Sequence, residues 1–377
     1  MMYHYSVGDN PKRLLELIHL AFRDCDMIIT TGGLGPTQDD LTKETIAKAM
    51  GERIVVSDMA MEALKSHYRK SERPMTENNL KQAYMPESAE VLPNDQGTAP
   101  GFWLEKDGKI IVSMPGPPRE MTNMFSKEVM PRLRSLQDSV IHYRILRTFG
   151  LRESKMETVL LPLIDEQTDP TIATYAKEGE CSLRIASKRA TLQEAKKAVD
   201  DMSQRVMDII GEYVYSQDNE DLKDVVGRLL ISKNITVSCA ESCTGGLFAG
   251  TLTDIPGISC VFDRGIVTYS NKAKMEELGV KEDTLETFGA VSSQTAAEMA
   301  EGLAEKTGSD LCISVTGIAG PGGGSLQKPV GTAYVGIRWK GNTEIIKIQR
   351  RNVNRKWNRN YAVLSMLYEI YKRISAI

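Results

Sequence analysis

The feature that most constrains the fold is a short apolar run that ends in a glycine- or proline-rich loop and leads into a helical pattern. This order occurs at residues 27–37 and 110–118, with helical patterns at 40–50 and 119–133, and a third time at residues 235–246. Strand, loop and helix in succession are typical of βαβ-type units, which build sheets covered by helices. The sequence therefore predicts an α/β fold.

The chain is long enough for more than one domain. At roughly 150 residues per domain, a chain of 377 residues predicts two or three. We expect an α/β domain over residues 1–138, a small α+β domain over 139–216 and an α/β domain over 217–377. The middle segment is assigned to the α+β class because an amphipathic helical pattern at 191–210 follows an alternating strand at 181–186.

Composition excludes several classes of protein. Apolar residues make up 41% and charged residues 26% of the chain, which allows each domain an ordinary core. No apolar run approaches the roughly 18 residues of a membrane span, and no basic-then-apolar leader opens the sequence. We therefore expect a cytoplasmic protein. The formal net charge of −3 argues against a chain that is basic throughout.

The positions of the histidines limit the chemistry of the last domain. All four, His4, His19, His67 and His142, precede residue 143. Any reaction in residues 217–377 must therefore run without the side chain that most often serves as general acid or base.

Residues 241–246, Glu-Ser-Cys-Thr-Gly-Gly, occupy a predicted strand-to-helix turn. Small residues let the backbone approach a ligand closely there, and the free N–H groups of a helix start attract anions. Ser242 could be an exposed nucleophile, with Thr244, Gly245 and Gly246 beside the ligand. The alternative is an ordinary helix start, with a Ser or Thr cap and glycines that serve packing.

A second loop, residues 317–324, holds five glycines in eight positions after a predicted strand. Thr316 and the backbone N–H groups that follow it, including those of Gly317, Gly320 and Gly322, could surround a phosphate or an oxyanion. The alternative is a plain flexible loop, and Pro321 argues against it because proline stiffens the chain.

Tyr269 and Lys274 lie between these loops, at a predicted strand-to-helix junction. Without histidine, lysine is the leading candidate for general base to a serine. Its pKa must then fall by about three units from roughly 10.4, which is equivalent to about 4 kcal/mol. A nearby phosphate would raise that pKa instead. Lys274 is therefore a buried base, a cation that binds phosphate, or an ordinary solvated lysine.

The C-terminal stretch from Arg338 to Arg373 carries ten Lys and Arg residues against two acidic ones, a net charge of +8. With Trp339, Trp357 and Tyr361 interleaved, a nucleic-acid patch is conceivable, although charge on a helix is more often a solvated face. One or two of the arginines could instead bind a ligand phosphate through two hydrogen bonds.

In the first domain a candidate nucleotide loop precedes two carboxylates. The residues are Gly32, Gly33, Gly35 and Thr37, followed by Asp39 and Asp40. Carboxylates beside a phosphate loop indicate a divalent metal ion that bridges to a nucleotide. The alternative is that the two aspartates complement the helix macrodipole, which is worth about 0.3–1 kcal/mol.

Longer motifs run through both ends of the chain. Those at the N-terminal end are Val7–Asn10, Thr31–Thr37 with Asp39–Asp40, Gly97–Gly101, and Pro115–Pro118 with Glu120–Met121. Those at the C-terminal end are Ala240–Gly246, Tyr269–Asn271 with Lys274, Gly289–Ser292, Thr316–Gly324 and Lys328–Thr332. With these motifs, essentially the whole chain resembles the competence/damage-inducible CinA family. The N-terminal motifs are similar to its molybdopterin-binding-type domain and the C-terminal ones to its nicotinamide-nucleotide amidase domain.

The resemblance implies hydrolysis of the carboxamide of nicotinamide mononucleotide to nicotinic acid mononucleotide and ammonia, without a cofactor. It implies that Ser242 is the nucleophile, Lys274 its base and Tyr269 an orienting hydroxyl. Thr316 and the N–H groups after it would form the phosphate or oxyanion site.

The resemblance also assigns the substrate phosphate to Arg355, which matches an arginine of the family's C-terminal motif. The chain departs from the family there, because the usual Gly-Asp before that arginine reads Val353-Asn354.

The beginning of the chain differs from the family pattern as well. Family members open with a further strand, loop and helix ahead of the Val7 motif. Some are credited with metal-dependent cleavage of ADP-ribose in this domain, and the absent segment supplies part of that nucleotide pocket. We therefore expect that activity to be lost or weak. An unpaired sheet edge would remain for a partner subunit, so we expect a homodimer.

Three hypotheses follow from the sequence. The first is an amidase in residues 217–377 that acts on nicotinamide mononucleotide. The second is a competence-associated protein that binds nucleotide or DNA without turnover, motivated by the +8 stretch. The third is a metal-dependent ADP-ribose pyrophosphatase in residues 1–138. We favour the first, and with it we expect no membrane and no nucleic-acid partner.

Overall fold

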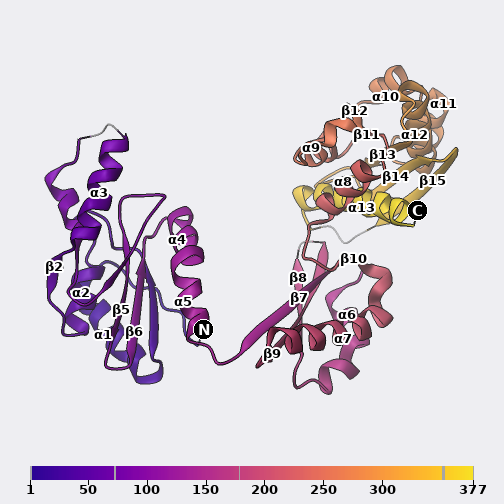
Figure 1. The fold of residues 1–377 in the computed structure, drawn as a ribbon. Helices are drawn as coiled ribbons and strands as arrows, with labels where there is room; N and C mark the ends of the chain where they lie inside the picture. The colour runs from indigo at the N-terminus through magenta and orange to yellow at the C-terminus, as the bar shows by residue number, and fades with distance from the viewer. Residues whose placement is uncertain (1, 72–73, 178, 350–352, 377) are drawn as a thin grey trace. The chain divides into compact units, whose positions relative to one another are not determined.

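The structure is a computed structural model that describes residues 2–71, 74–177, 179–349 and 353–376. The chain divides into two compact units, Met1–Asp138 and Ser139–Ile377 (Figure 1). No helix in the described part of the chain is long and apolar enough to cross a membrane.

The first unit is an α/β domain, as predicted. Its helices are α1 (Pro11–Asp24), α2 (Thr42–Ala49), α3 (Asp58–Ser71), α4 (Pro118–Met124) and α5 (Met130–Ser135), with a 3₁₀ helix at Glu77–Ala83. Its strands are β1 (Met27–Thr31), β2 (Ile54–Val56), β3 (Tyr84–Pro86), β4 (Glu90–Leu92), β5 (Gly101–Lys106) and β6 (Lys109–Met114). The main sheet has the order β1-β6-β5-β4, with β1 parallel to β6, and β2 pairs separately with β3.

The helix predicted at residues 119–133 is helical from Pro118 to Ser135, but it is not a regular α-helix throughout. A π-turn at Phe125–Val129 joins α4 to α5. Pro131 lies just beyond this turn and has no N–H to donate to the ladder of hydrogen bonds. The wider turn accommodates that missing donor.

The middle domain opens the second unit and is α+β, as predicted. Its strands are β7 (Val140–Phe149), β8 (Thr171–Lys177), β9 (Glu180–Arg189) and β10 (Val214–Ser216), and its helices are α6 (Glu153–Asp165) and α7 (Leu192–Ile210). The antiparallel sheet has the order β10-β7-β9-β8, and both helices pack on the face that carries Leu146 and Leu183. Strand β8 was not expected, because its sequence Thr-Ile-Ala-Thr-Tyr-Ala-Lys has little apolar alternation.

The C-terminal domain is the second α/β domain. Its helices are α8 (Leu222–Ser232), α9 (Leu247–Thr253), α10 (Asn271–Leu278), α11 (Glu282–Phe288), α12 (Ser293–Thr307) and α13 (Arg355–Ser375). Its strands are β11 (Val237–Glu241), β12 (Phe262–Val267), β13 (Leu311–Gly317), β14 (Thr332–Trp339) and β15 (Asn342–Gln349). The sheet order is β12-β11-β13-β14-β15, in which β12, β11 and β13 are parallel and the other pairs antiparallel.

Helices cover both faces of this sheet, and its central strands β11 and β13 are buried on both sides, whereas the edge strands β12 and β15 are partly exposed. Ala240 and Cys312 pack with α10, α11 and α12 on one face. Val237 and Ile313 pack with α8, α9 and α13 on the other. Figure 1 shows α10, α11 and α12 gathered on the opposite side of the strands from α8 and α13. Burial on both faces explains why the runs that predicted β11 and β13 are largely apolar.

Three loops meet at one edge of the C-terminal sheet. Glu241 at the end of β11 is the register partner of Val267 on β12 and of Val315 on β13. The carboxyl ends of these three parallel strands therefore lie together, which is where ligands bind in open α/β sheets. Residues 242–246, 268–270 and 318–331 all leave the sheet from this edge.

Candidate active site

Ser242 and Lys274 are the central pair of the site. Ser242 follows β11 directly, and Lys274 lies in the first turn of α10, after β12. Lys274 Nζ donates a hydrogen bond to Ser242 Oγ at 3.0 Å and another to the carbonyl oxygen of Thr268 at 2.8 Å. Residues 32 positions apart in the sequence are thus brought together because their strands are parallel neighbours.

The surroundings of Lys274 favour its neutral form. Its side chain is only 1% exposed, and no carboxylate of the described chain lies within ion-pair distance of Nζ. Burial lowers the pKa of Lys274 below its usual 10.5, and only the neighbouring Cys243 thiol acts weakly in the other direction. An ammonium here would lose its hydration without gaining a counter-ion. Of the three readings of Lys274, the geometry favours a buried base.

The turn after β11 is held by the protein's own carboxylate. Glu241 is fully buried, and its carboxylate accepts hydrogen bonds from the backbone N–H groups of Gly246 (3.0 Å), Phe248 (3.1 Å) and Ala249 (2.8 Å). The N–H of Gly245 donates to the carbonyl of Ser242 at 3.1 Å. Our expectation that free N–H groups at the start of α9 face a ligand anion is therefore wrong, because Glu241 already occupies them.

Two other N–H groups of the turn remain available. Those of Cys243 and Thr244 donate to no oxygen atom in the described ranges of the chain. The residue after a serine nucleophile commonly supplies an oxyanion donor. Gly245 and Gly246 take the left-handed conformation, with φ of 58° and 91°, and this folds the turn back over Ser242. Burial raises the pKa of the Cys243 thiol to about 11, so it stays protonated near neutral pH.

The second glycine loop is fastened at both ends. The N–H of Ile318 donates to the carbonyl of Thr332, and the N–H of Gly331 to the carbonyl of Ile318, both at 2.8 Å. Thr316 is buried, and its hydroxyl donates to the carbonyl of Ala290 at 2.7 Å, so that hydroxyl is already used inside the protein. Gly317 lies against β14, where a Cβ would stand 2.6 Å from that of Ala333.

The middle of this loop carries N–H groups that, unlike those of Ile318 and Gly331, make no hydrogen bond within the described residues. Within the described residues, those of Ala319, Gly320 and Gly322–Gly324 have no protein acceptor. They form a short stretch of free donors at the same sheet edge as Ser242. This arrangement suits a phosphate or an oxyanion, as predicted for this loop.

Two arginines of α13 hold the two loops. Arg355 donates to the carbonyl of Gly320 at 2.7 Å and to the hydroxyl of Tyr269 at 2.9 Å. Arg359, one helical turn further, donates to the carbonyl of Thr244 at 2.5 Å. Tyr269 is 61% exposed and therefore orients Arg355 rather than Ser242 or Lys274. Sequence reasoning counted Arg359 only as part of a charge run, although its spacing of four residues from Arg355 placed both on one helix face.

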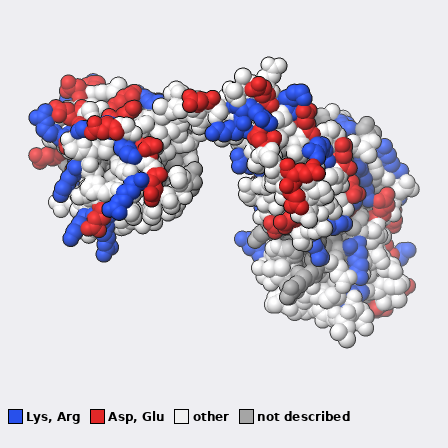
Figure 2. Space-filling view, turned by 90° about the horizontal axis from the view of Figure 1, so that it is seen from below, with Lys and Arg blue, Asp and Glu red and all other residues white. Residues whose placement is uncertain are grey.

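Within the described residues, two cations at the end of the +8 stretch are paired with carboxylates. Arg373 forms ion pairs with Glu369 and Glu344, and Lys372 with Glu369. Arg350 and Arg351 lie outside the described residues. On the face seen in Figure 2, Lys and Arg side chains are interspersed with Asp and Glu.

In the first unit the aspartates have different surroundings. Asp40 accepts hydrogen bonds from the N–H (2.9 Å) and hydroxyl (2.5 Å) of Thr37, whereas Asp39 is exposed. Burial alone would raise the pKa of Asp40, but the bonds from Thr37 hold it below its usual value. Lys81 Nζ donates to the carbonyls of Thr37 and Asp40.

The loop that carries Gly32, Gly33 and Gly35 is thus closed by side chains of its own domain. Gly33 must be glycine, because a Cβ would lie 2.0 Å from the hydroxyl oxygen of Thr42. Across the described ranges, no three His, Cys, Asp or Glu side chains converge as a metal site requires. Asp40 therefore closes the loop through Thr37 and does not cap α2, whose N-cap residue is Leu41 and makes no side-chain capping bond.

Three family models match the chain. Residues 1–135 match the "Probable molybdopterin binding domain", residues 143–216 the "Damage-inducible protein CinA KH domain" and residues 219–374 the "CinA C-terminal domain". The fold and these matches define a three-domain α/β protein with molybdopterin-binding-like, KH and CinA C-terminal domains.

Relatives that align with most of the chain carry the name of a competence-damage inducible protein. A "Putative competence-damage inducible protein" of Clostridium novyi is 48% identical over 91% of this chain and 83% of its own length. One of the same name from Acetivibrio thermocellus is 47% identical over 96% and 88%. A solved structure of a competence/damage inducible protein from Agrobacterium tumefaciens is 42% identical over 41% of this chain and 97% of its own, with a TM-score of 0.39. The chain belongs to the CinA family.

Proposed function

We propose that the C-terminal domain hydrolyses the carboxamide of nicotinamide mononucleotide to nicotinic acid mononucleotide and ammonia. The observation that carries this proposal is the 3.0 Å contact between Lys274 Nζ and Ser242 Oγ in a domain without histidine. A buried lysine with a lowered pKa can be a neutral amine, and here it is within reach of the serine proton. The family resemblance supplies the substrate.

The first half of the reaction releases ammonia. Ser242 Oγ attacks the carboxamide carbon while Lys274 Nζ takes the hydroxyl proton. The N–H groups of Cys243 and Thr244 are the candidate donors to the oxyanion that forms. Lys274 then returns the proton to the amide nitrogen as the C–N bond breaks, so that ammonia leaves and an ester remains on Ser242.

The second half consumes one water molecule. Lys274 takes a proton from water as the water oxygen attacks the ester carbon. The C–O bond to Ser242 then breaks and the lysine returns the proton to Ser242 Oγ. The carboxylic acid formed loses its proton to solvent. Each cycle thus consumes one water and releases one ammonia, and the same amine acts first as base and then as acid in both halves.

The phosphate of the substrate has a candidate site in the second glycine loop. The guanidinium of Arg355 donates to the carbonyl of Gly320, and the free N–H groups of Gly322–Gly324 follow in the same loop. Arg355 now binds a neutral carbonyl and a neutral hydroxyl, and a phosphate would be a stronger acceptor for the same N–H groups. This supports Arg355 as the phosphate ligand despite the departure at Val353-Asn354.

The proposal is tested by ammonia release from nicotinamide mononucleotide in the full chain. Wild-type protein should give equal amounts of ammonia and nicotinic acid mononucleotide, and Ser242→Ala should give neither. Lys272→Ala is the matched control, because Lys272 lies on the same helix two residues from Lys274 with a side chain that is 77% exposed. Wild-type protein that releases no ammonia, or Ser242→Ala protein that retains the full rate, would refute the proposal.

A further inference from the structure

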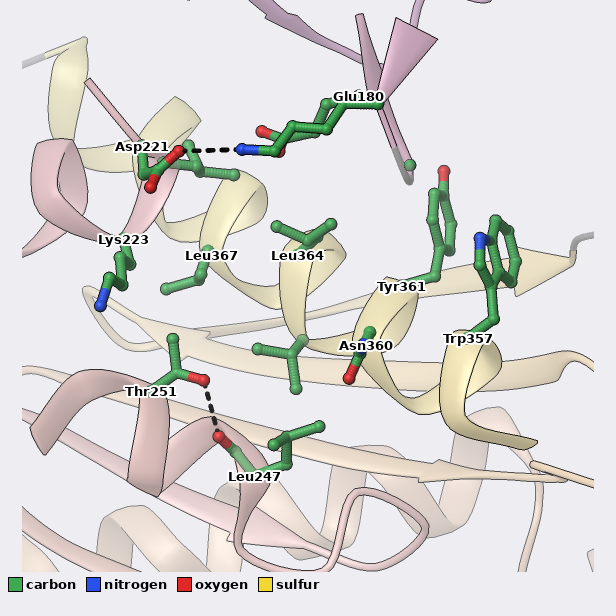
Figure 3. Close-up of a pocket in the computed structure, with 14 residues that line it drawn as sticks. Glu180, Asp221, Lys223, Leu247, Thr251, Trp357, Asn360, Tyr361, Leu364 and Leu367 are labelled. Carbon is green, nitrogen blue, oxygen red and sulfur yellow. Dashed lines mark hydrogen bonds and ion pairs between the residues drawn. The ribbon is translucent and has the colours of Figure 1, made fainter. Parts of the chain in front are cut away.

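A cavity separate from the Ser242 site lies between the middle domain and the C-terminal domain. Its volume is about 280 Å³, just below the range of roughly 300–1,000 Å³ that is typical of small-molecule sites. The middle domain contributes the ends of β8 and β9, and the C-terminal domain contributes α8, α9 and α13 (Figure 3). Such junctions between domains are common places for ligand sites.

The cavity has an apolar floor and an aromatic end. The floor is formed by Leu222, Leu247, Val363, Leu364 and Leu367. Trp357 and Tyr361 stand side by side at one end, with rings 5.1 Å apart and almost parallel (Figure 3). These walls would bury the apolar body of a small ligand rather than a sugar or a polyphosphate.

The two acidic side chains at the cavity share one arginine. Glu180 is buried and accepts a hydrogen bond from Tyr215 Oη at 2.6 Å, and Arg147 Nη2 lies 3.7 Å from it. Asp221 accepts a hydrogen bond from the same Arg147 nitrogen at 2.7 Å. Arg147 thus contacts both carboxylates, but its single positive charge offsets only one of the two negative charges; Lys177, 3.4 Å from the same Asp221 oxygen, is the second cation.

The two lysines at the cavity are less firmly held. Lys177 is 60% exposed, and within the described chain it lies 3.4 Å from the Asp221 oxygen that Arg147 already occupies. Lys223 reaches the exposed Asp254 at 3.2 Å. Exposed pairs of this kind contribute about 0–1 kcal/mol, so either lysine can exchange its partner for a ligand anion at little cost.

We propose that this cavity binds a small amphipathic monoanion, an aromatic or medium-chain carboxylate. Its apolar body lies on the leucine floor beside Trp357 and Tyr361. Its carboxylate lies between Lys177 and Lys223, which come from different domains, so the ligand joins the middle domain to the C-terminal domain.

Helices α9 and α13, which line the cavity, also lead to the candidate active site. Leu247 lines the cavity and directly follows Gly246 of the Ser242 turn. Trp357 lies between Arg355 and Arg359, whose guanidiniums hold Gly320 and Thr244. A ligand that fixes α9 and α13 therefore acts on both loops, and the cavity is an effector site. This last step rests on the proposed amidase function.

Binding is tested by titrating the full chain with 2-naphthoate by calorimetry. We expect one site per chain that persists when nicotinamide mononucleotide is saturating. The double variant Lys177→Ala/Lys223→Ala should weaken binding at least tenfold. The neutral analogue 2-naphthalenemethanol should bind wild-type protein at least tenfold more weakly than the acid. Leu364→Trp, which fills the cavity, should abolish binding. The matched control is Lys188→Ala/Lys233→Ala, which removes two exposed lysines outside the cavity.

Different outcomes test the proposed cavity site, its effector role and the proposed amidase function separately. No saturable binding, displacement of the acid by the nucleotide, or equal binding by the Lys177→Ala/Lys223→Ala variant would overturn the proposed site. If the site is confirmed, saturating 2-naphthoate should change the rate of ammonia release at least twofold in wild-type protein and not in Leu364→Trp. Binding that leaves this rate unchanged would overturn the effector role. Failure of wild-type protein to release ammonia at all would count against the amidase alone.

Discussion

Lys274 Nζ lies 3.0 Å from Ser242 Oγ, and the lysine side chain is buried without a carboxylate beside it in the described chain. The pair has the geometry of a nucleophile and its base, and burial lowers the pKa of the base. The rate of ammonia release should therefore increase with pH. As pH rises through the folded-state pKa of Lys274, the amine loses its proton and kcat/KM should rise to a plateau.

This pH profile is measured from pH 6 to 10 with nicotinamide mononucleotide as substrate. The midpoint should fall below 10.5, and Lys272→Ala should not move it. The Cys243 thiol, with its pKa raised to about 11, does not titrate in this range. A rate that falls as pH rises from 6 to 10 would contradict a neutral lysine base.

The same burial predicts how stability depends on pH. Between the lowered pKa of folded Lys274 and 10.5, the unfolded chain binds more protons than the folded one, so the free energy of unfolding rises with pH across that window. Lys274→Met removes this contribution. The wild-type free energy of unfolding, minus that of Lys274→Met, should increase as pH approaches 10.5.

Urea unfolding at a series of pH values measures this difference. Lys43, whose pKa burial lowers to about 8, contributes equally to both proteins and cancels. A difference that stays constant from pH 7 to 10 would show that Lys274 is not desolvated in the folded protein.

Glu241 should stabilise the turn that carries Ser242. Glu241→Ala leaves three N–H groups without their acceptor, and each buried unsatisfied donor costs about 1–3 kcal/mol. We expect a loss of about 3 kcal/mol or more in the free energy of unfolding, measured with urea. Glu305→Ala, an exposed position on α12, is the control and should change it by less than about 0.5 kcal/mol. Equal stability of both variants would remove Glu241 from this role.

The two arginines of α13 should affect different kinetic constants. Arg359→Met frees the carbonyl of Thr244 in the nucleophile turn, so kcat should fall. Arg355→Met removes the candidate phosphate ligand, so KM should rise with little change in kcat. Steady-state rates over a range of nicotinamide mononucleotide concentrations separate the two effects. If Arg359→Met raises KM and Arg355→Met lowers kcat instead, the roles assigned to the two arginines must be exchanged.

Two helix glycines should respond oppositely to alanine. At Gly302 of α12 a Cβ would lie 1.8 Å from the carbonyl oxygen of Leu278, whereas at Gly250 of α9 nothing lies within 4 Å. Alanine is a better helix former than glycine by about 1 kcal/mol. Gly250→Ala should therefore raise the melting temperature and Gly302→Ala should lower it. A rise in both would mean that α12 can move away from α10.

Local patterns predicted most of the elements, and in the C-terminal domain the central strands β11 and β13 are buried on both faces and read as largely apolar runs. Strand β8 was missed because it lacks such a run and depends on pairing with β9. The apolar run that predicts β11 ends at Cys239, yet the strand continues to Glu241, whose carboxylate is satisfied only by N–H groups at the start of α9. These bonds run to backbone N–H groups five to eight residues further along the chain, and backbone groups leave no mark in the sequence.

The candidate site was predicted in part. Ser242, Lys274 and the two glycine loops could be selected because small residues and one lysine stand out in a histidine-free domain. Arg359 and Glu241 could not be assigned a role because their partners are backbone groups. Arg359 binds the carbonyl of Thr244, and Glu241 binds N–H groups at the start of α9. The roles of all these residues in a reaction stay predictions, as do DNA binding and ADP-ribose cleavage.

The central claim is that Ser242 and Lys274 act as one unit. The most direct measurement is kcat/KM for ammonia release by Ser242→Ala, Lys274→Met and the double variant, beside wild-type protein. Loss of a general base costs about 10²–10⁴-fold, and residues that act as a unit lose their effect together. We expect the double variant to be no slower than the slower single variant. Losses that multiply in the double variant, or a single variant that keeps the wild-type rate, would contradict the account.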